Sequence, residues 1–166
     1  APGVTRNYPH TPGIDAVGTI SQSVDGNFKE GDTVIVTGYD LGMNTSGGFG
    51  EYIRVPSSWA ITLPDSLTEK DSMCLGTAGL TAGLSIQALA DFDTTNGFNE
   101  SKSIVTGSTG GVGSIALMLL AKLGSQVTAV TGKESQKELL FGLGASEILS
   151  REELSEVSRK PMGKPI

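Results

Sequence analysis

The sequence is poor in the residues that build disulfides and zinc sites. Its 166 residues include one cysteine, Cys74, and one histidine, His10. A single cysteine cannot form an internal disulfide, which makes the cytoplasm the expected compartment. One Cys and one His cannot supply a tetrahedral Cys/His zinc site either. We therefore interpret both as structural, and we expect the Cys74 thiol to be buried because Met73 and Leu75 flank it.

Two further absences narrow the class of partner. No run rich in Lys and Arg occurs, and the net charge is −6 with a sequence pI of about 4.7. Because an acidic chain repels phosphate backbones, nucleic acid is not expected as a partner. The longest uninterrupted apolar stretch, residues 115–121, is far shorter than the roughly 20 residues of a membrane-spanning helix. The sequence therefore predicts neither a nucleic-acid-binding nor a membrane protein.

The first half of the chain has the pattern of a small β-rich domain. Short runs with β-branched or alternating apolar residues lie at residues 16–20, 33–37 and 51–55. Turn signals separate these runs, and Pro56 follows the last of them. Each run is therefore predicted to be a strand.

Helix signals begin near residue 65. Ser66 followed by Glu69 is typical of a capping box and predicts a helix start. A second helix is expected over residues 80–90, where Leu80, Leu84 and Ala88 recur at helical spacing.

After residue 100 the pattern alternates between strand and helix. Strands are expected at residues 103–106, 126–130 and 146–149, and helices at 114–123 and from Ser135, where Ser135 and Glu138 suggest a capping box. This alternation implies a parallel sheet. A complete dinucleotide fold uses about six strands. We therefore expect either that the chain is a piece of a longer protein or that partner strands come from elsewhere.

A glycine turn joins the first of these strands to its helix. Gly107, Gly110 and Gly113 are spaced three apart. In a dinucleotide-binding βαβ unit, one such glycine permits the tight turn, one lets the backbone approach the pyrophosphate, and one lets the helix pack closely on the strand. The helix N-terminus then offers N–H groups and a positive dipole end to the phosphates.

The end of the second strand indicates which dinucleotide fits. NAD-selective folds place an Asp or Glu there to hold the ribose 2′-hydroxyl. This chain has Thr131-Gly132-Lys133, and the lysine could pair with a 2′-phosphate, so NADPH is the predicted cofactor. The alternative is that Lys133 is only a solvated charge and that Glu134 holds the ribose.

Two other classes with glycine loops do not fit. A P-loop needs Gly-Lys-Ser/Thr, whereas Gly113 is followed by Ser114 and Ile115. Short-chain dehydrogenases share the pattern of residues 106–113 but carry it near the N-terminus, with a Tyr-x-x-x-Lys downstream. Here about a hundred residues precede the motif, and no tyrosine follows it.

Several motifs in one order carry a family resemblance. They lie at residues 12–18, 31–34, 47–52, 76–82, 105–113, 131–135 and 143–145. On these residues the chain resembles the medium-chain dehydrogenase/reductase superfamily, and within it the zinc-free branch of acrylyl-CoA reductases and related quinone oxidoreductases. The resemblance implies an α/β chain with a partial GroES-like β domain at residues 1–75. It further implies a partial Rossmann domain, a doubly wound parallel sheet, at 76–166, with NADPH in the cleft between them.

The resemblance also assigns roles to individual residues. It implies that a glycine-loop group covers the pyrophosphate: Thr109, Gly110, Gly111 and Val112. It places Thr131, Gly132 and Lys133 near the 2′-phosphate, with Arg151 as a further arginine that reaches the adenosine phosphate. The nicotinamide pocket would be lined by Thr77 and Thr81. Lysine at 133 replaces the family's usual arginine, which keeps the charge but loses the planar fork.

Departures from the family pattern refine the expected chemistry. Zinc-dependent relatives have Gly-His-Glu where this chain has Gly13-Ile14-Asp15, and a cysteine near Thr77, so no metal is expected at the site. The family's N-terminal Asn-Tyr segment and about its last third have no counterpart here, so the fragment alone should not turn over substrate.

The expected activity is NADPH-dependent reduction of a small molecule with an activated C=C bond, such as acrylyl-CoA. The alternatives are a quinone reductase of the ζ-crystallin type and a non-catalytic NADPH-binding module. No proton donor can be assigned: Tyr39 and Tyr52 are the nearby candidates, and each is more readily interpreted as structural. The family's dimers make a homodimer the default assembly.

Overall fold

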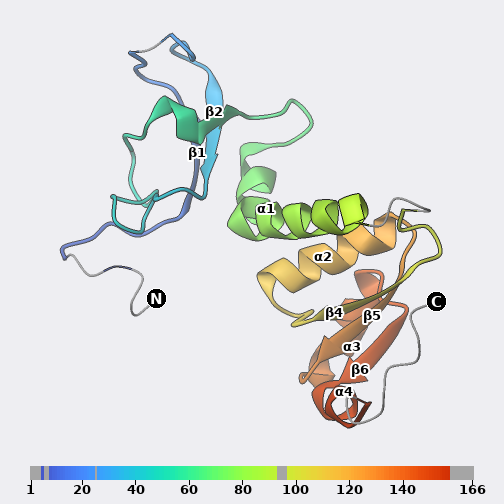
Figure 1. Cartoon of the computed structure of the whole chain (residues 1–166). Coiled ribbons are helices and arrows are strands. Elements are labelled where there is room, and N and C mark those ends of the chain that lie inside the picture. Colours follow the sequence, from blue (N-terminus) through green and yellow to red (C-terminus); the bar gives the residue numbers. More distant parts are fainter. Residues whose placement is uncertain (1–4, 6–7, 25, 93–96, 158–166) are drawn as a thin grey trace. The chain divides into compact units, whose positions relative to one another are not determined.

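The computed structural model describes residue 5 and residues 8–24, 26–92 and 97–157. The chain divides into two compact units, Ala1–Leu80 and Thr81–Ile166. The division falls inside helix α1 (Glu69–Phe92), which begins in the first unit and ends in the second (Figure 1).

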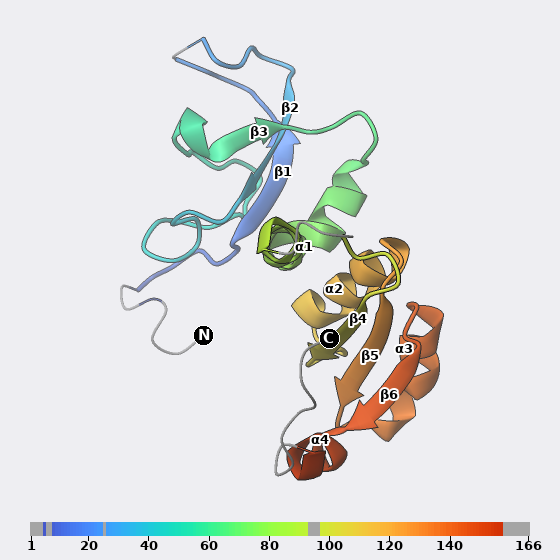
Figure 2. The ribbon, with the colours of Figure 1, turned by 45° about the vertical axis from the view of Figure 1, so that its right-hand side comes forward.

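The first unit is built on a three-stranded antiparallel sheet with the order β1-β2-β3 (Figure 2). Its strands are β1 (Asp15–Thr19), β2 (Thr33–Thr37) and β3 (Ala60–Thr62). Val34 and Val36 of β2 are buried, as is Leu41 in the loop that follows. The first two predicted strands are therefore confirmed.

The predicted strand at residues 51–55 is wrong. In the described part of the chain these residues have no strand pairing, and the third strand is β3, which follows a short 3-10 helix, η1 (Ser57–Trp59). Alternation showed that residues 51–55 could be extended but could not supply a partner. The three residues of β3 are too few for a periodic signal, although Val34 pairs with Thr62 and Val36 with Ala60.

Helix α1 begins at a different cap from the predicted one. The Thr68 hydroxyl oxygen accepts a hydrogen bond from the backbone N–H of Asp71 at 3.1 Å, and the Asp71 carboxylate accepts one from that hydroxyl at 2.6 Å. Ser66 instead lies in a turn in which the Leu67 N–H donates to the Pro64 carbonyl at 3.0 Å. The capping box of Ser66 and Glu69 is therefore wrong, since the turn withdraws Ser66 from the helix.

The packed face of α1 also differs from the predicted stripe. Ala82 and Ile86 are buried, whereas Leu80 and Leu84 are 46% and 62% exposed. The helix is apolar on more than one side, so spacing alone could not choose the side that packs. The prediction of a helix over residues 80–90 is confirmed, but the choice of its inner face is not.

By length and composition alone, α1 could cross a membrane. Its apolar window has a mean hydropathy of 1.4, although the sequence held no long uninterrupted run. Helices in the cores of other proteins have the same length and apolar composition, so these two properties alone do not indicate a membrane span. Here the helix is broken at Gly76, and Ile86 packs in the core of the second unit. We draw no membrane association from it.

The second unit is a three-stranded parallel sheet with the order β4-β5-β6. Its strands are β4 (Lys102–Thr106), β5 (Gln126–Thr131) and β6 (Glu147–Ser150), and its helices are α2 (Gly111–Lys122), α3 (Lys137–Gly142) and α4 (Arg151–Val157). Figure 2 shows α2 beside β4 and β5, and α3 beside β6. The core contains Leu117 and Leu120 of α2, Val127 and Ala129 of β5, and Leu140 of α3. The predicted parallel order is confirmed.

Two helix starts in this unit were predicted inaccurately. A short 3-10 helix, η2 (Glu134–Gln136), precedes α3, whose N-cap is Gln136 with no side-chain hydrogen bond. The capping box of Ser135 and Glu138 is therefore wrong, because Ser135 lies within the 3-10 turn. α2 begins at Gly111, earlier than predicted, because the glycines at the end of the loop already belong to the helix.

A true capping box closes the start of α4. The Ser150 N–H donates to the Glu153 carboxylate at 2.8 Å, and the Glu153 N–H donates to the Ser150 hydroxyl oxygen at 3.1 Å. The hydrogen bond from the Ser150 backbone N–H holds the pKa of the Glu153 carboxyl below its usual range. The cap fixes the start of α4 and with it Arg151, the first residue of the helix.

Candidate dinucleotide site

Three loops meet at one edge of the parallel sheet. The strands β4, β5 and β6 end at Thr106, Thr131 and Ser150, and Thr131 pairs with Ser150. In open parallel sheets, ligands bind outside the carboxyl ends of the strands. The glycine loop, the turn at Gly132 and the start of α4 all leave from these ends.

The glycine loop packs tightly on the start of α2, and at one position, Gly113, the contact leaves room only for glycine. A Cβ atom added to Gly113 would lie 2.3 Å from the Gly107 carbonyl oxygen, a distance that real Cβ atoms essentially never show. Gly107 has a φ of +62°, and the Gly110 N–H donates to the Gly107 carbonyl at 2.8 Å. Gly113 is therefore the glycine that lets α2 start against the loop.

The start of α2 presents backbone rather than side chains. Its N-cap is Gly110, which has no side chain to accept from the N–H groups of the first turn. Gly110 and Gly111 are exposed, Val112 is 41% exposed, and Thr109 is partly buried. The N–H groups at a helix start carry a partial positive charge, so this end of α2 can accept an anion.

Ser108 fixes the loop to the sheet, a role that the sequence reasoning missed. The residue is fully buried. Its hydroxyl donates to the Val105 carbonyl of β4 at 2.6 Å and accepts from the Val130 N–H of β5 at 3.1 Å. The loop is thus held to two strands by one side chain. A small polar residue inside a glycine turn is the signal that could have indicated this role.

Replacing Ser108 with alanine is expected to lower the free energy of unfolding by about 1–3 kcal/mol, because the buried Val130 N–H loses its side-chain acceptor. Chemical denaturation checks this. Ser114→Ala serves as the control, since the Ser114 hydroxyl bonds only a neighbouring carbonyl within its own helix. Equal stability of the two variants would contradict the role given to Ser108.

Four predicted residues lie at and just beyond the end of β5. A Cβ atom on Gly132 would lie 3.4 to 3.7 Å from the Cδ, Nε and Cζ atoms of Arg151, so the guanidinium end of Arg151 packs over the glycine. Lys133 follows directly and is exposed. Thr131 is buried, and its hydroxyl oxygen accepts from the Lys133 N–H at 3.0 Å. The Arg151 side chain therefore lies over Gly132, and Thr131 shapes the turn that carries the exposed Lys133.

The carboxylate that offered an alternative ribose ligand has a partner of its own. Glu134 forms an ion pair with Lys137 at 2.6 Å, and both side chains are largely exposed. This pairing draws Glu134 toward α3. The strand end itself carries no acidic residue.

Thr77 and Thr81 lie on α1, after its break at Gly76. The Thr77 hydroxyl donates to the Asp15 carboxylate at 2.8 Å. Thr81 is exposed, and its carbonyl accepts from the Ser85 hydroxyl at 2.8 Å. Thr77 belongs to the first unit, and Thr81 is the first residue of the second.

The chain is similar to several known oxidoreductases over nearly its whole length. Residues 2–65 match the alcohol dehydrogenase GroES-like domain. Acrylyl-CoA reductase AcuI of Ruegeria pomeroyi is 42% identical over 99% of this chain and 49% of its own length. Escherichia coli K-12 YhdH with bound NADPH has a TM-score of 0.88 at 43% identity, over 99% of this chain and 50% of that one. Bacillus subtilis YhfP with NAD bound has a TM-score of 0.84 at 45% identity, over 90% and 45%.

The chain is thus similar over nearly its whole length to proteins of the medium-chain dehydrogenase/reductase superfamily. The predicted GroES-like domain followed by a partial Rossmann fold is confirmed. The chain spans about half the length of the curated relatives that it matches, 49% in the case of AcuI.

Of the residues that the resemblance compares with zinc ligands, Ile14 has no group that binds a metal, and the Asp15 carboxylate accepts a hydrogen bond from the Thr77 hydroxyl. In the part of the chain that the structure describes, no group of three or more His, Cys, Asp or Glu residues could hold a metal ion.

The lone Cys and the lone His differ in how they fit their predictions. The His10 imidazole Nε2 lies 2.9 Å from the Gly42 carbonyl and is partly buried, as expected of a structural residue. Cys74 is exposed, so the prediction of a buried thiol is wrong. Apolar neighbours in the sequence did not bury it because successive residues of a helix point in different directions.

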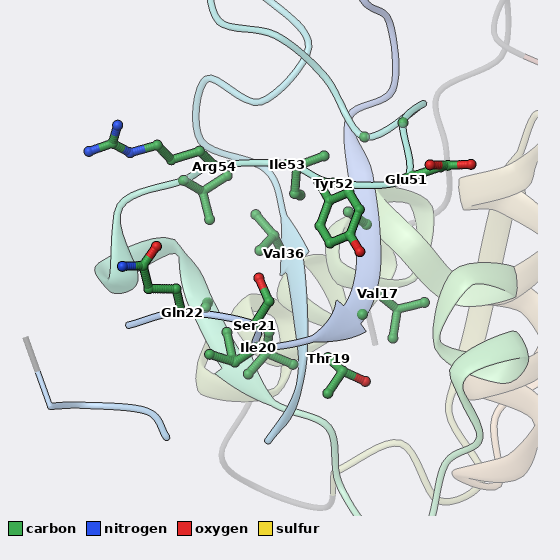
Figure 3. Close-up of a pocket in the computed structure, with 17 residues that line it drawn as sticks. Val17, Thr19, Ile20, Ser21, Gln22, Val36, Glu51, Tyr52, Ile53 and Arg54 are labelled. Carbon is green, nitrogen blue, oxygen red and sulfur yellow. The ribbon is translucent and has the colours of Figure 1, made fainter. Parts of the chain in front are cut away.

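A pocket of about 240 Å³ lies in the first unit, beside β1 and β2. Figure 3 shows residues 51–55 running past these strands, with the Arg54 side chain pointing away from the sheet. Tyr52 lines the pocket and is 83% exposed. Tyr39 does not line it and instead stacks on Trp59 with ring centroids 5.3 Å apart. Of the two tyrosines considered as proton donors, Tyr39 thus has a structural contact.

Proposed function

We propose that this chain binds NADPH at the carboxyl edge of β4, β5 and β6 and forms part of an oxidoreductase. The proposed reaction is reduction of the activated C=C bond of an enoyl-type substrate such as acrylyl-CoA. The observation that carries the proposal is the close approach of Gly113 to the Gly107 carbonyl, which lets α2 start against the loop with the exposed Gly110 and Gly111 at its end. Support for the substrate comes from the 42% identical acrylyl-CoA reductase.

The glycine loop suits the pyrophosphate of a dinucleotide. Gly110 and Gly111 expose their backbone, so an anion can approach the first-turn N–H groups without meeting a Cβ atom. The apolar helix behind them directs its positive dipole end to the same place. In this proposal Thr109 and Val112 cover the pyrophosphate, and Gly107 shapes the turn.

The group beyond β5 suits a phosphate on the adenosine ribose. Arg151 packs over Gly132, Lys133 follows Gly132 directly in the chain, and no carboxylate stands at the strand end. A dianionic phosphate is favoured by such a pair, and the planar Arg151 guanidinium can bind two of its oxygens. The relative crystallised with NAD makes this choice of cofactor the point to test.

Replacing Lys133 and Arg151 together with alanine is expected to weaken NADPH binding roughly 10- to 100-fold and to leave NADH binding nearly unchanged, because only NADPH carries the 2′-phosphate. Titration of the complete natural gene product with both cofactors measures this. Lys137→Ala is the matched control, since its ammonium is paired with Glu134. A wild-type preference for NADH, or an equal loss for both cofactors, would refute the assignment.

NADPH would supply the hydride for reduction of the substrate. The share of this chain would be to hold and orient it: the glycine loop at the pyrophosphate, Lys133 and Arg151 at the adenosine end, and Thr77 and Thr81 at the nicotinamide end. No residue is assigned as the proton donor. Tyr52 lines the pocket of the first unit and is the remaining candidate proton donor to test by mutation.

The reaction itself is tested on the complete gene product. We expect oxidation of NADPH with acrylyl-CoA, without added zinc and in the presence of a chelator. Oxidation with a quinone alone would favour the quinone reductase, and tight NADPH binding without turnover of either acceptor would favour a non-catalytic module. We also propose a cytoplasmic homodimer, which light scattering of the purified gene product would test.

A further inference from the structure

Arg151 stands where strand β6 passes directly into helix α4 (Figure 2). The residue before it, Ser150, pairs with Thr131 at the end of the neighbouring strand β5. The register of the parallel sheet therefore brings the next two residues, Arg151 and Gly132, side by side. The result is the contact described above, in which the Arg151 side chain lies over Gly132. All four residues belong to the second unit.

The sheet fixes the place of Arg151 but not the direction that the backbone takes after it. That direction is set by the capping box, in which the Ser150 N–H donates to the Glu153 carboxylate at 2.8 Å and the Glu153 N–H donates to the Ser150 hydroxyl oxygen at 3.1 Å. The Ser155 hydroxyl also donates to the Arg151 carbonyl, at 2.9 Å. Because α4 has only 7 residues, and helices shorter than about 12 residues have little stability of their own, its first turn depends on the box.

The helical conformation decides where the Arg151 side chain points. In an α-helix each Cα–Cβ bond is tilted toward the N-terminus. The N-terminus of α4 faces the end of β6, so the side chain of its first residue is directed back to the strand ends. Gly132 lies at this edge of the sheet, which is why the Arg151 side chain can pack over it. If the first turn opened, the guanidinium would lose this direction.

The charge of Glu153 does not by itself favour a phosphate site. A negative charge two residues from Arg151 opposes the binding of an anion there. The Glu153 carboxylate accepts from the Ser150 N–H and forms no ion pair with Arg151, although the structure describes both residues. The carboxylate therefore serves the backbone of the first turn and does not neutralise the arginine.

We infer that Ser150 and Glu153 are positioning residues that hold the Arg151 guanidinium toward the phosphate on the adenosine ribose, and so contribute to the choice of NADPH over NADH. This inference rests on the proposed function, which assigns Arg151 to that phosphate. Neither residue touches the cofactor in this scheme, and both act through Arg151.

The neighbouring carboxylate provides a matched control. Glu152 is exposed and takes no part in the box. Glu152→Ala and Glu153→Ala each remove one negative charge next to Arg151, but only the second opens the box. The complete gene product is titrated with NADPH and with NADH, and the ratio of the two affinities is measured. We expect Glu153→Ala to lower the preference for NADPH about 2- to 5-fold relative to Glu152→Ala, as for the loss of a helix N-cap.

Conservative variants separate the hydrogen bonds from the charge. Glu153→Gln keeps an oxygen that accepts from the Ser150 N–H, so it should retain the preference of Glu152→Ala. Ser150→Ala should lower the preference as Glu153→Ala does, and Ser150→Thr, which keeps a hydroxyl oxygen, should restore it. Combining Ser150→Ala with Glu153→Ala should lower the preference little further, because both hydrogen bonds support the same turn.

An arginine-free background tests whether the box acts through Arg151. In a gene product that already carries Arg151→Ala, the change Glu153→Ala should leave the ratio of affinities where it is, because the positioned group is gone. An effect of Glu153→Ala that persists in this background would overturn the positioning role, since Glu153 would then act on the phosphate without Arg151.

The outcomes separate this inference from the proposed function. Failure of the gene product to bind NADPH, or a ratio that Arg151→Ala and Lys133→Ala together leave unchanged, would overturn both. A ratio that falls in Arg151→Ala but is the same in Glu153→Ala as in Glu152→Ala would overturn the inference alone. Lower thermal stability of Glu153→Ala with that same ratio would show that the box only stabilises the helix. Should Ser150→Ala fail to fold, the variants of the exposed Glu153 still decide.

Discussion

Replacing Gly113 with alanine is expected to weaken NADPH binding about 100-fold, the equivalent of one or two charge-assisted hydrogen bonds. The added methyl group would lie 2.3 Å from the Gly107 carbonyl oxygen and 3.0 Å from the Ser108 Cα atom, both of them backbone. Backbone cannot step aside as the end of a side chain can, so the start of α2 must move off the loop. The overpacking should also lower stability by about 1–3 kcal/mol.

Two other glycines provide graded controls for this experiment. A Cβ atom on Gly110 would meet the Gly107 carbonyl oxygen at 3.3 Å, a contact that a small shift relieves, so Gly110→Ala should have a smaller effect on stability. Gly83, within α1, has nothing within 4 Å, and its replacement by alanine should stabilise the helix by roughly 0.5–1 kcal/mol. Cofactor titration and chemical denaturation of the three variants give the series. Wild-type affinity in Gly113→Ala would contradict the proposed loop geometry.

Replacing Leu140 with alanine is expected to lower the free energy of unfolding by about 2–5 kcal/mol, because the side chain is fully buried and leaves a cavity. It belongs to the core cluster that also contains Leu117 and Val127. The adjacent Leu139 is 52% exposed, and its replacement should cost less than about 0.5 kcal/mol.

The pair Leu139 and Leu140 tests the packing of α3 with identical chemistry at neighbouring positions. Urea denaturation of both variants gives the comparison. Similar losses at the two positions would mean that α3 does not pack on the sheet through the face seen here. A larger loss at Leu139 would reverse the orientation of the helix.

The second unit was the more predictable half of the fold. Its strands are apolar runs with clear glycine stops, and Gly124 and Gly144 end α2 and α3 with φ of +94° and +106°. Such signals are local, so they can be read without knowing the tertiary contacts. The order of the glycines between β4 and α2 was sufficient to place the loop at the carboxyl edge of the sheet.

The features that sequence missed depend on contacts between distant residues. Ser108 gains its role from Val130, and the Asp15 carboxylate meets the Thr77 hydroxyl although 62 residues separate them. The inner face of α1 is decided by what Ile86 meets in the core, which no periodicity shows. The contact of Arg151 with Gly132 was anticipated only through the family resemblance, since the two residues are separated by α3 and β6.

The most direct test of the account is an NMR titration of the gene product, labelled with ¹⁵N-glycine, with NADPH. We predict that the amide signals of Gly111 and Gly113 move furthest and saturate with the cofactor, because their N–H groups lie in the first turn of α2 and meet the diphosphate. The Gly110 signal should move less, since its N–H already donates to the Gly107 carbonyl. The signals of Gly26 and Gly31, in the first unit, should stay in place. Binding of NADPH that leaves the signals of the loop unchanged would contradict the central claim.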